Sequence, residues 1–138
     1  MMMCKLKYLI VACLTAFYVS CGSRSARAQN VEGFEEQIAL SDSMLLYFQQ
    51  EQFDKIVRHF DDNLKQQLNK EQLATVWVQL NAQLGKYTKG ELYSAEKIKA
   101  VGDKVVYQCY FGSQKLYFLL FYGKDNKIAG IFFKPQPN

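Results

Sequence analysis

The sequence contains few of the side chains that most often carry catalytic or metal chemistry. It has one histidine, His59, and four cysteines, of which only Cys109 lies beyond residue 28. One cysteine cannot form an internal disulfide, and one histidine with one cysteine cannot make a structural zinc site. A G-x-S-x-G nucleophile elbow, a P-loop and a dinucleotide-binding glycine fingerprint are also absent. We therefore expect no metal, no cofactor and a domain held together by its core.

The body of the chain also lacks an excess of charge of either sign. The whole sequence has 17 lysines and arginines against 13 acidic residues, a net charge of +4. Four of the basic residues precede Gln29 and all 13 acidic residues follow it, so residues 29–138 carry 13 charges of each sign. A nucleic-acid-binding protein needs a basic surface to neutralise phosphates. We expect no nucleic-acid partner.

No apolar run is long enough to cross a bilayer as a helix, which takes about 20 residues. The longest such run near the N-terminus, residues 8–19, follows Lys5 and Lys7 and resembles the apolar region of a secretory signal. Ala26-Arg27-Ala28 supplies the small residues of a signal-peptidase site. The sequence therefore predicts a signal peptide over residues 1–28 and one domain over residues 29–138, exported to the periplasm or secreted.

A second ending of the signal competes with the first. Val19-Ser20-Cys21-Gly22 directly follows the apolar run and resembles a bacterial lipobox, although Tyr18 stands where leucine is normal. In that alternative, residues 1–20 are a lipoprotein signal and Cys21 is the lipidated N-terminus of a membrane-anchored protein. We favour cleavage after Ala28, and both alternatives predict export.

The first half of the body has helical periodicity. Residues 32–50 place Phe34, Ile38, Leu45 and Phe48 near one stripe. Residues 53–60 repeat apolar side chains at helical spacing, which puts Asp54 and His59 on opposite flanks of the stripe and favours an Asp54–Arg58 pair. Residues 69–84 begin with a capping box and end before Gly85, a good residue for a helix C-terminus. We expect His59 to be a flank residue without a catalytic role.

Beyond Lys86 the apolar period changes to that of strands. Residues 91–101, 104–111, 115–122 and 127–134 are rich in Val, Ile, Tyr and Phe and are separated by short turns. Such short turns join only antiparallel neighbours. Helices followed by strands predict an α+β fold, in which N-terminal helices pack on a curved four-stranded antiparallel meander.

The predicted sheet is apolar on both faces. In residues 105–111 and 115–122 the side chains on either face are mostly Val, Leu, Tyr or Phe. A sheet with one solvated face should alternate apolar with polar side chains. We therefore expect the second face to be covered by the N-terminal helix, another subunit or a ligand.

Five segments carry a family resemblance: Phe53–Val57, Phe60–Asp61, Leu73 with Trp77, Gly85–Tyr87 and Lys127–Pro135. Through them, over about residues 45–135, the chain resembles the domain of unknown function 3887 family, and the resemblance implies a nuclear-transport-factor-2-like, cone-shaped α+β fold. Most of these are core and turn residues. The resemblance implies a curved sheet wrapped by helices around an apolar pocket, and it supplies no catalytic residues.

The aromatic side chains are the remaining signal for function. Core packing and a subunit interface account for most of them, but a cone fold can leave a cavity between sheet and helices. The candidate pocket residues are Trp77, Tyr107, Tyr110, Phe118 and Tyr122. We predict a non-catalytic exported module that binds a small apolar or peptide ligand, or dimerises through its sheet. The alternative is an isomerase- or cyclase-like enzyme, which would need an inward acid beside a pocket tyrosine.

Overall fold

The computed structural model describes residues 31–135 of the 138-residue chain. The predicted signal peptide, the cleavage site after Ala28 and the alternative lipidation site at Cys21 lie outside the described residues. Within them, no helix is both long enough and apolar enough to span a bilayer.

Helices occupy the first half of the described residues, as the periodicity predicted. They are α2 (Glu35–Gln49), α3 (Phe53–Val57), α4 (Asp62–Gln67) and α5 (Lys70–Leu84). The predicted capping box is present at the start of α5, where Asn69 Oδ1 accepts from the Gln72 backbone N–H and Gln72 Oε1 accepts from the Asn69 N–H. Gly85 follows the helix with a φ of +102°, in the left-handed region that glycine tolerates best.

The sheet is a four-stranded antiparallel meander with strand order β1-β2-β3-β4. Its strands are β1 (Tyr87–Ile98), β2 (Gly102–Phe111), β3 (Gln114–Tyr122) and β4 (Ile128–Pro135), and a 3₁₀ turn, η1 (Lys124–Asn126), joins the last two. Irregular register interrupts the β1–β2 pairing around Tyr93 and the β3–β4 pairing around Ala129. The sheet is open, and the predicted α+β order of helices followed by a meander is confirmed.

Gly102 makes the tight turn into β2 possible. Its φ is +125°, and a Cβ at this position would lie 2.0 Å from the backbone oxygen of Tyr122 on the adjacent strand. Only a residue without a side chain allows this approach. Gly102 therefore holds the start of β2 against the end of β3.

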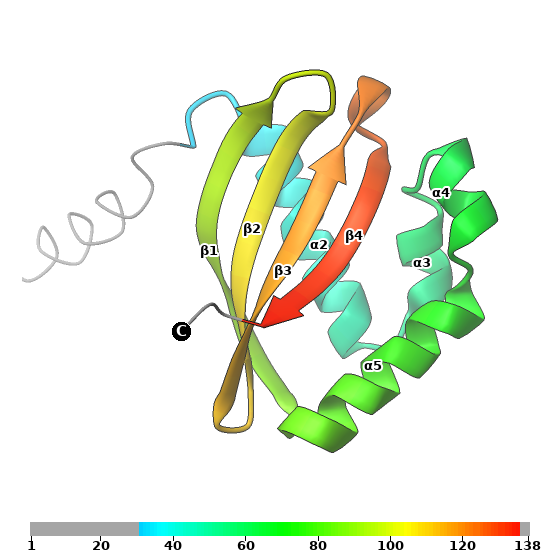
Figure 1. Cartoon of the computed structure of the whole chain (residues 1–138), viewed down its shortest axis with the longest axis vertical. Coiled ribbons are helices and arrows are strands. Elements are labelled where there is room, and N and C mark those ends of the chain that lie inside the picture. The colour runs from blue at the N-terminus through cyan, green and yellow to red at the C-terminus, as the bar shows by residue number, and fades with distance from the viewer. Residues whose placement is uncertain (1–30, 136–138) are drawn as a thin grey trace, which may run out of the picture. The chain divides into compact units, whose positions relative to one another are not determined.

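The helices are gathered on one side of the sheet. In Figure 1, α2 runs behind the strands while α3, α4 and α5 lie beside β4, and no labelled helix crosses the front face. The covered face carries alternate residues of β2 and β3 that are at most 8 % exposed: Val105, Tyr107, Cys109, Phe111, Leu116, Phe118, Leu120 and Tyr122. These side chains form one core with Met44, Phe48, Ile56 and Trp77 of the helices.

The segment after α3 joins the helices to the edge strand β4. The predicted helix over residues 53–60 ends at Val57, and Phe60 instead forms a parallel bridge with Ile128. The Ile128 N–H donates to the His59 backbone oxygen at 2.7 Å, and the Asp61 N–H donates to the Ile128 oxygen at 2.9 Å. This bridge gives the edge of the sheet additional backbone hydrogen bonds.

Candidate functional site

Four of the five candidate pocket residues lie on the helix-covered side of the sheet. Phe118 is fully buried, and its ring stacks on Phe133 with centroids 4.8 Å apart. Trp77 of α5 is 5 % exposed and its ring lies 5.0 Å from Phe48 and 5.6 Å from Phe111, measured between centroids. These aromatic contacts fill the space between the sheet and the helices, so Phe118 belongs to the packed core.

Tyr107 and Tyr122 are buried, and their hydroxyl groups are held by α2. The Tyr122 hydroxyl lies 2.7 Å from Ser41 Oγ. Because Ser41 donates its own proton to the Gln37 carbonyl at 2.7 Å, Tyr122 is the donor to Ser41. The Tyr107 hydroxyl contacts the Asp42 carboxylate and the Ile38 carbonyl oxygen. The two tyrosines therefore fasten the helix to the sheet.

The environment keeps both phenols protonated. Burial raises the pKa of Tyr122 to about 12. Burial also raises the pKa of Tyr107, and the hydrogen bond to Asp42 and the negative charge of that residue raise it further. Neither hydroxyl is prepared to act as a base at neutral pH.

Asp42 is the acid that the sequence did not single out. Its carboxylate reaches the Tyr107 hydroxyl from α2. Asp42 stands four residues after Ile38, so helical spacing puts it on the same side of the helix as the predicted apolar stripe. That spacing is the sequence feature from which its position facing the sheet could have been predicted. The Asp42 residue is exposed, however, and neither it nor Tyr107 borders the hollow beside Trp77 described below.

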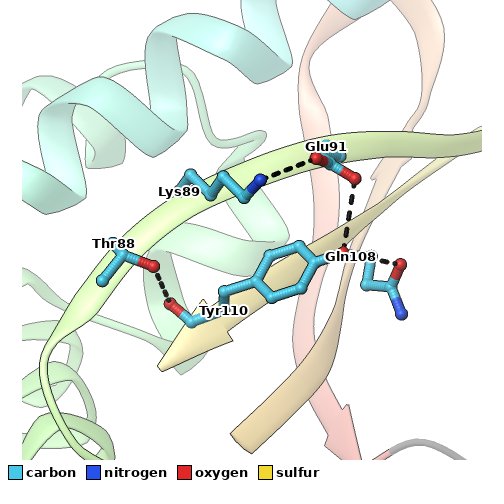
Figure 2. Close-up of polar contacts among 5 residues, drawn as sticks. All are labelled: Thr88, Lys89, Glu91, Gln108 and Tyr110. Carbon is cyan, nitrogen blue, oxygen red and sulfur yellow. Dashed lines mark hydrogen bonds and ion pairs between the residues drawn. The ribbon is translucent and has the colours of Figure 1, made fainter. Parts of the chain in front are cut away.

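Tyr110 lies on the opposite, open face of the sheet, apart from the other four candidates. Its hydroxyl is 3.3 Å from Glu91 Oε2 and 3.4 Å from Gln108 Oε1, while Lys89 pairs with Glu91 at 3.0 Å (Figure 2). The ammonium groups of Lys89 and Lys115 lie 5.0 and 5.3 Å from the centre of its ring. The structure therefore does not bring the five candidates around one cavity.

The environments of His59 and Cys109 are those of residues that support the fold. His59 is half-buried, and loss of solvation followed by the charge of Lys127 lowers the pKa of its imidazole. The predicted Asp54–Arg58 pair forms at 3.7 Å on the exposed side of α3. Burial raises the pKa of the Cys109 thiol to about 12, which leaves the unreactive protonated form. Among residues 31–135, no three His, Cys, Asp or Glu side chains are grouped so as to hold a metal ion.

A hollow of about 540 Å³ lies beside Trp77, where the chain leaves α2 and where it passes from α5 to β1. Its lining includes the rings of Trp77 and Tyr87, whose centroids are 5.3 Å apart. Val78 and four polar or charged side chains complete it: Gln49, Glu51, Asn81 and Lys86. Trp77 is thus the one candidate that borders this hollow, and Glu51 and Lys86 are lining residues that the sequence did not indicate.

The open face of the sheet carries an apolar patch of five side chains, Tyr93, Val106, Leu119, Phe121 and Phe132. Val106, Leu119 and Phe132 are direct neighbours across β2, β3 and β4. Tyr93 and Phe132 are 59 % and 49 % exposed, whereas Val106 and Leu119 are only 6 % and 9 % exposed. The Phe121 ring packs edge-on against Phe132 with centroids 5.8 Å apart. The predicted apolar second face is confirmed, and no described helix covers it (Figure 1).

Together, the helices and the open meander define a class of α+β domain with one sheet face packed on helices and one left uncovered by them. The model of the family described as protein of unknown function (DUF3887) matches residues 41–131, well over half of the chain. The chain belongs to this family, which confirms the resemblance found in the sequence. No curated protein and no solved structure gives a significant match.

Proposed function

We propose that the chain is an exported, non-catalytic binding module that self-associates through the open face of its sheet. The observation that carries the proposal is the apolar patch, whose two most exposed aromatic residues are Tyr93 and Phe132. Monomeric soluble proteins rarely expose large contiguous apolar patches. Polar residues lie around it, including Lys89 and Lys115 near one end and the Lys104–Glu96 ion pair near the other. An apolar centre within a polar rim is the usual anatomy of a protein interface.

The size of the face suits a second copy of the chain. Four strands spaced about 4.8 Å apart, each with about eight residues rising 3.3 Å, give a flat area on the order of 500 Å². Side-chain relief raises the accessible area above this value, toward the ~800 Å² that each partner buries in a standard interface. Two such sheets can pack face to face at about 10 Å.

The N-terminal segment is a weaker candidate for covering the face. After the proposed cleavage following Ala28, only Gln29 and Asn30 precede the described residues. Two residues span at most about 7 Å, which is less than the separation of three strands. A second copy is therefore the occupant that we propose.

Light scattering coupled to size exclusion tests the proposal on the processed protein. Phe132→Ser removes an exposed ring from the patch, and Leu46→Ser is the matched control, because Leu46 is also 49 % exposed but lies on α2. We expect a wild-type dimer, a Phe132→Ser monomer and a dimeric control. A wild-type protein that stays monomeric at near-millimolar concentration would refute self-association.

Binding of a small apolar or peptide ligand is the second part of the proposed function, and the hollow beside Trp77 favours it. Pockets for small ligands have volumes of roughly 300–1,000 Å³ and combine aromatic walls with a few polar groups. An isomerase- or cyclase-like enzyme is a less favoured alternative. The Asp42–Tyr107 contact is the observation in its favour, but Asp42 is exposed and neither residue borders this hollow.

The export proposal has its own measurement. Intact mass spectrometry of the protein recovered from the cell envelope distinguishes an N-terminus at Gln29 from a lipidated Cys21. We expect a soluble exported form beginning at Gln29. A diacylglycerol-sized mass addition at Cys21 would instead establish the lipoprotein alternative.

A further inference from the structure

The hollow beside Trp77 opens to the surface, and two exposed residues of opposite charge, Glu51 and Lys86, lie on its border. Glu51 borders it from the connection after α2, and Lys86 borders it from the connection between α5 and β1. The ion pairs formed among the described residues are Arg58–Asp54, Lys89–Glu91 and Lys104–Glu96, so neither Glu51 nor Lys86 is neutralised by a partner within residues 31–135. One carboxylate and one ammonium therefore border a hollow that also contains two aromatic rings.

The backbone around the hollow is held in place. Asn81 Nδ2 donates to the Trp77 carbonyl at 2.8 Å, and Asn81 Oδ1 accepts from the Tyr87 N–H at 2.8 Å. The Lys86 carbonyl accepts from the Gly112 N–H at 3.0 Å. These bonds connect the end of α5 to the start of the sheet, so a ligand would meet a lining that is already ordered.

Glu51 stands at the end of α2, directly after the C-cap residue Gln50, and has a φ of +58°. Its N–H donates to the Phe48 carbonyl at 3.1 Å, and the Gln52 N–H donates to the Tyr47 carbonyl at 2.8 Å. This pair of hydrogen bonds is the common ending of a helix in a left-handed residue. Glycine is the usual residue at such a position, so the backbone should accept glycine in place of Glu51.

We infer that the hollow binds a small zwitterion with an aromatic or apolar side chain, that is, a free amino acid or a dipeptide. Lys86 pairs with the carboxylate, Glu51 pairs with the ammonium group, and the side chain packs against the small accessible parts of Trp77 and Tyr87, which are 5 % and 8 % exposed. The volume of about 540 Å³ is sufficient for a ligand of this size. The inference rests on the ligand-binding part of the proposed function and is independent of self-association.

Trp77 provides a direct readout, because it is the only tryptophan in the chain. Its fluorescence, excited at a wavelength that phenylalanine does not absorb, is titrated with L-phenylalanine and with phenylalanyl-phenylalanine. Three analogues isolate the charges: N-acetyl-phenylalanine lacks the ammonium, phenylalaninamide lacks the carboxylate, and N-acetyl-phenylalaninamide lacks both. We expect a saturable change with the zwitterions and binding that is up to about fivefold weaker with each analogue, the most that one exposed ion pair contributes.

Single substitutions assign the two charges. Lys86→Gln should weaken zwitterion binding by up to about fivefold and leave phenylalaninamide binding unchanged, because that analogue has no carboxylate. Glu51→Gln should weaken zwitterion binding by up to about fivefold and leave N-acetyl-phenylalanine binding unchanged, because that analogue has no ammonium group. Matched controls on other surfaces, the exposed Lys65→Gln and Glu36→Gln, should bind as the wild type does. Glu51→Gly adds a second test, because it suits the left-handed backbone and removes the carboxylate. We expect it to keep or raise the melting temperature while weakening the zwitterions.

The possible failures are distinguishable. If N-acetyl-phenylalaninamide binds as tightly as phenylalanine, the hollow is a simple apolar site; the zwitterion inference is then wrong and the ligand-binding proposal stands. If no probe changes the fluorescence at millimolar concentration, both are wrong. If Lys86→Gln and Glu51→Gln bind all probes as the wild type does, the assignment of charges is overturned.

Discussion

Both faces of the sheet are rich in apolar side chains, although the open face also carries Lys104, Gln108 and Lys115, and the surroundings of the two faces differ. On the face packed against the helices, Val105, Phe118 and Leu120 are fully buried. On the open face, which no described helix covers, Val106 and Leu119 are still only 6 % and 9 % exposed, whereas Phe132 is 49 % exposed. The hydroxyl groups differ as well, because Tyr122 bonds to a buried serine whereas Tyr110 joins a cluster of surface charges. Composition alone therefore does not decide which face is core.

The largest expected difference between the faces comes from removing one phenyl ring from each. Phe118→Ala and Phe121→Ala change the same residue type in the same strand, on opposite faces. Phe118→Ala should lower the free energy of unfolding by about 3–5 kcal/mol, because it leaves a cavity in the packed core. Phe121→Ala should cost less than half as much, because its ring is only partly buried.

Urea denaturation at low protein concentration measures this pair of changes on the monomer. Equal losses for the two variants would contradict the comparison. A Phe121→Ala loss that grows with protein concentration would place this ring in the dimer interface and support self-association.

A glycine on each face gives the second comparison. A Cβ added to Gly90 would lie 2.7 Å from Leu45 Cδ1 of α2, whereas one added to Gly130 would meet only the rings of Phe132 and Phe121, at 3.1 and 3.3 Å. Gly90→Ala should therefore destabilise the fold by about 1–3 kcal/mol through overpacking. Gly130→Ala should cost less than about 1 kcal/mol, because open-face rings can rotate away.

Thermal denaturation by circular dichroism measures both glycine variants. The comparison fails if Gly130→Ala is the more damaging change. It would also fail if Gly90→Ala left the melting temperature unchanged, since α2 could then move away from the sheet without loss.

Removing one hydroxyl from each face gives a smaller difference. Tyr122→Phe deletes the hydrogen bond to Ser41 and should cost about 1 kcal/mol, the usual net value of a buried hydrogen bond. Tyr110→Phe deletes contacts of 3.3 and 3.4 Å at a half-buried position and should change stability by less than about 0.5 kcal/mol. Chemical denaturation of both variants in parallel decides the point, and a larger loss in Tyr110→Phe would reverse our ranking of the two networks.

Much of the fold could be predicted because local rules determine it. Alternation along residues 105–111 correctly separated the two faces, and the Asn69–Gln72 capping box marked the start of α5. The start of β1 was predicted four residues late, at Glu91 instead of Tyr87. Gly85 ends α5 just before this strand. Gly90 lies within β1, where a Cβ would come 2.7 Å from Leu45 Cδ1, so this glycine does not mark a turn. The short helix α4 was also not predicted, since Leu64 and Leu68 alone show too little periodicity.

The sites were harder to predict because they depend on the distances between elements. The sequence correctly placed Tyr107, Phe118 and Tyr122 in the sheet, but whether a cavity remains beneath them depends on how closely α2 approaches. The aromatic contacts of Phe48 and the hydroxyl contact of Ser41 fill that space. The hollow beside Trp77 is bordered by two connections 35 residues apart, at Glu51 and Lys86. No local pattern relates those two residues.

The smallest expected effect concerns His59, which lies at the edge of the sheet beside β4. Because desolvation lowers the pKa of its imidazole below the ordinary value of 6.5, the unfolded chain takes up a proton more readily than the folded chain does. The neutral His59 imidazole therefore makes its full contribution to the free energy of unfolding above about pH 6.5. The free energy of unfolding decreases as the pH falls from that value toward the lowered pKa of the folded state.

His59→Gln should remove the pH dependence that comes from this imidazole. The unfolding free energy of the wild type minus that of the variant should therefore decrease as the pH falls from 8 to 5. Urea titrations at several pH values measure the slope, and Arg58→Gln, which alters an exposed neighbour, is the control. His59→Ala should leave both self-association and the Trp77 fluorescence titrations unchanged. A folded His59→Ala variant that lost either property would show that this histidine takes part in self-association or in ligand binding.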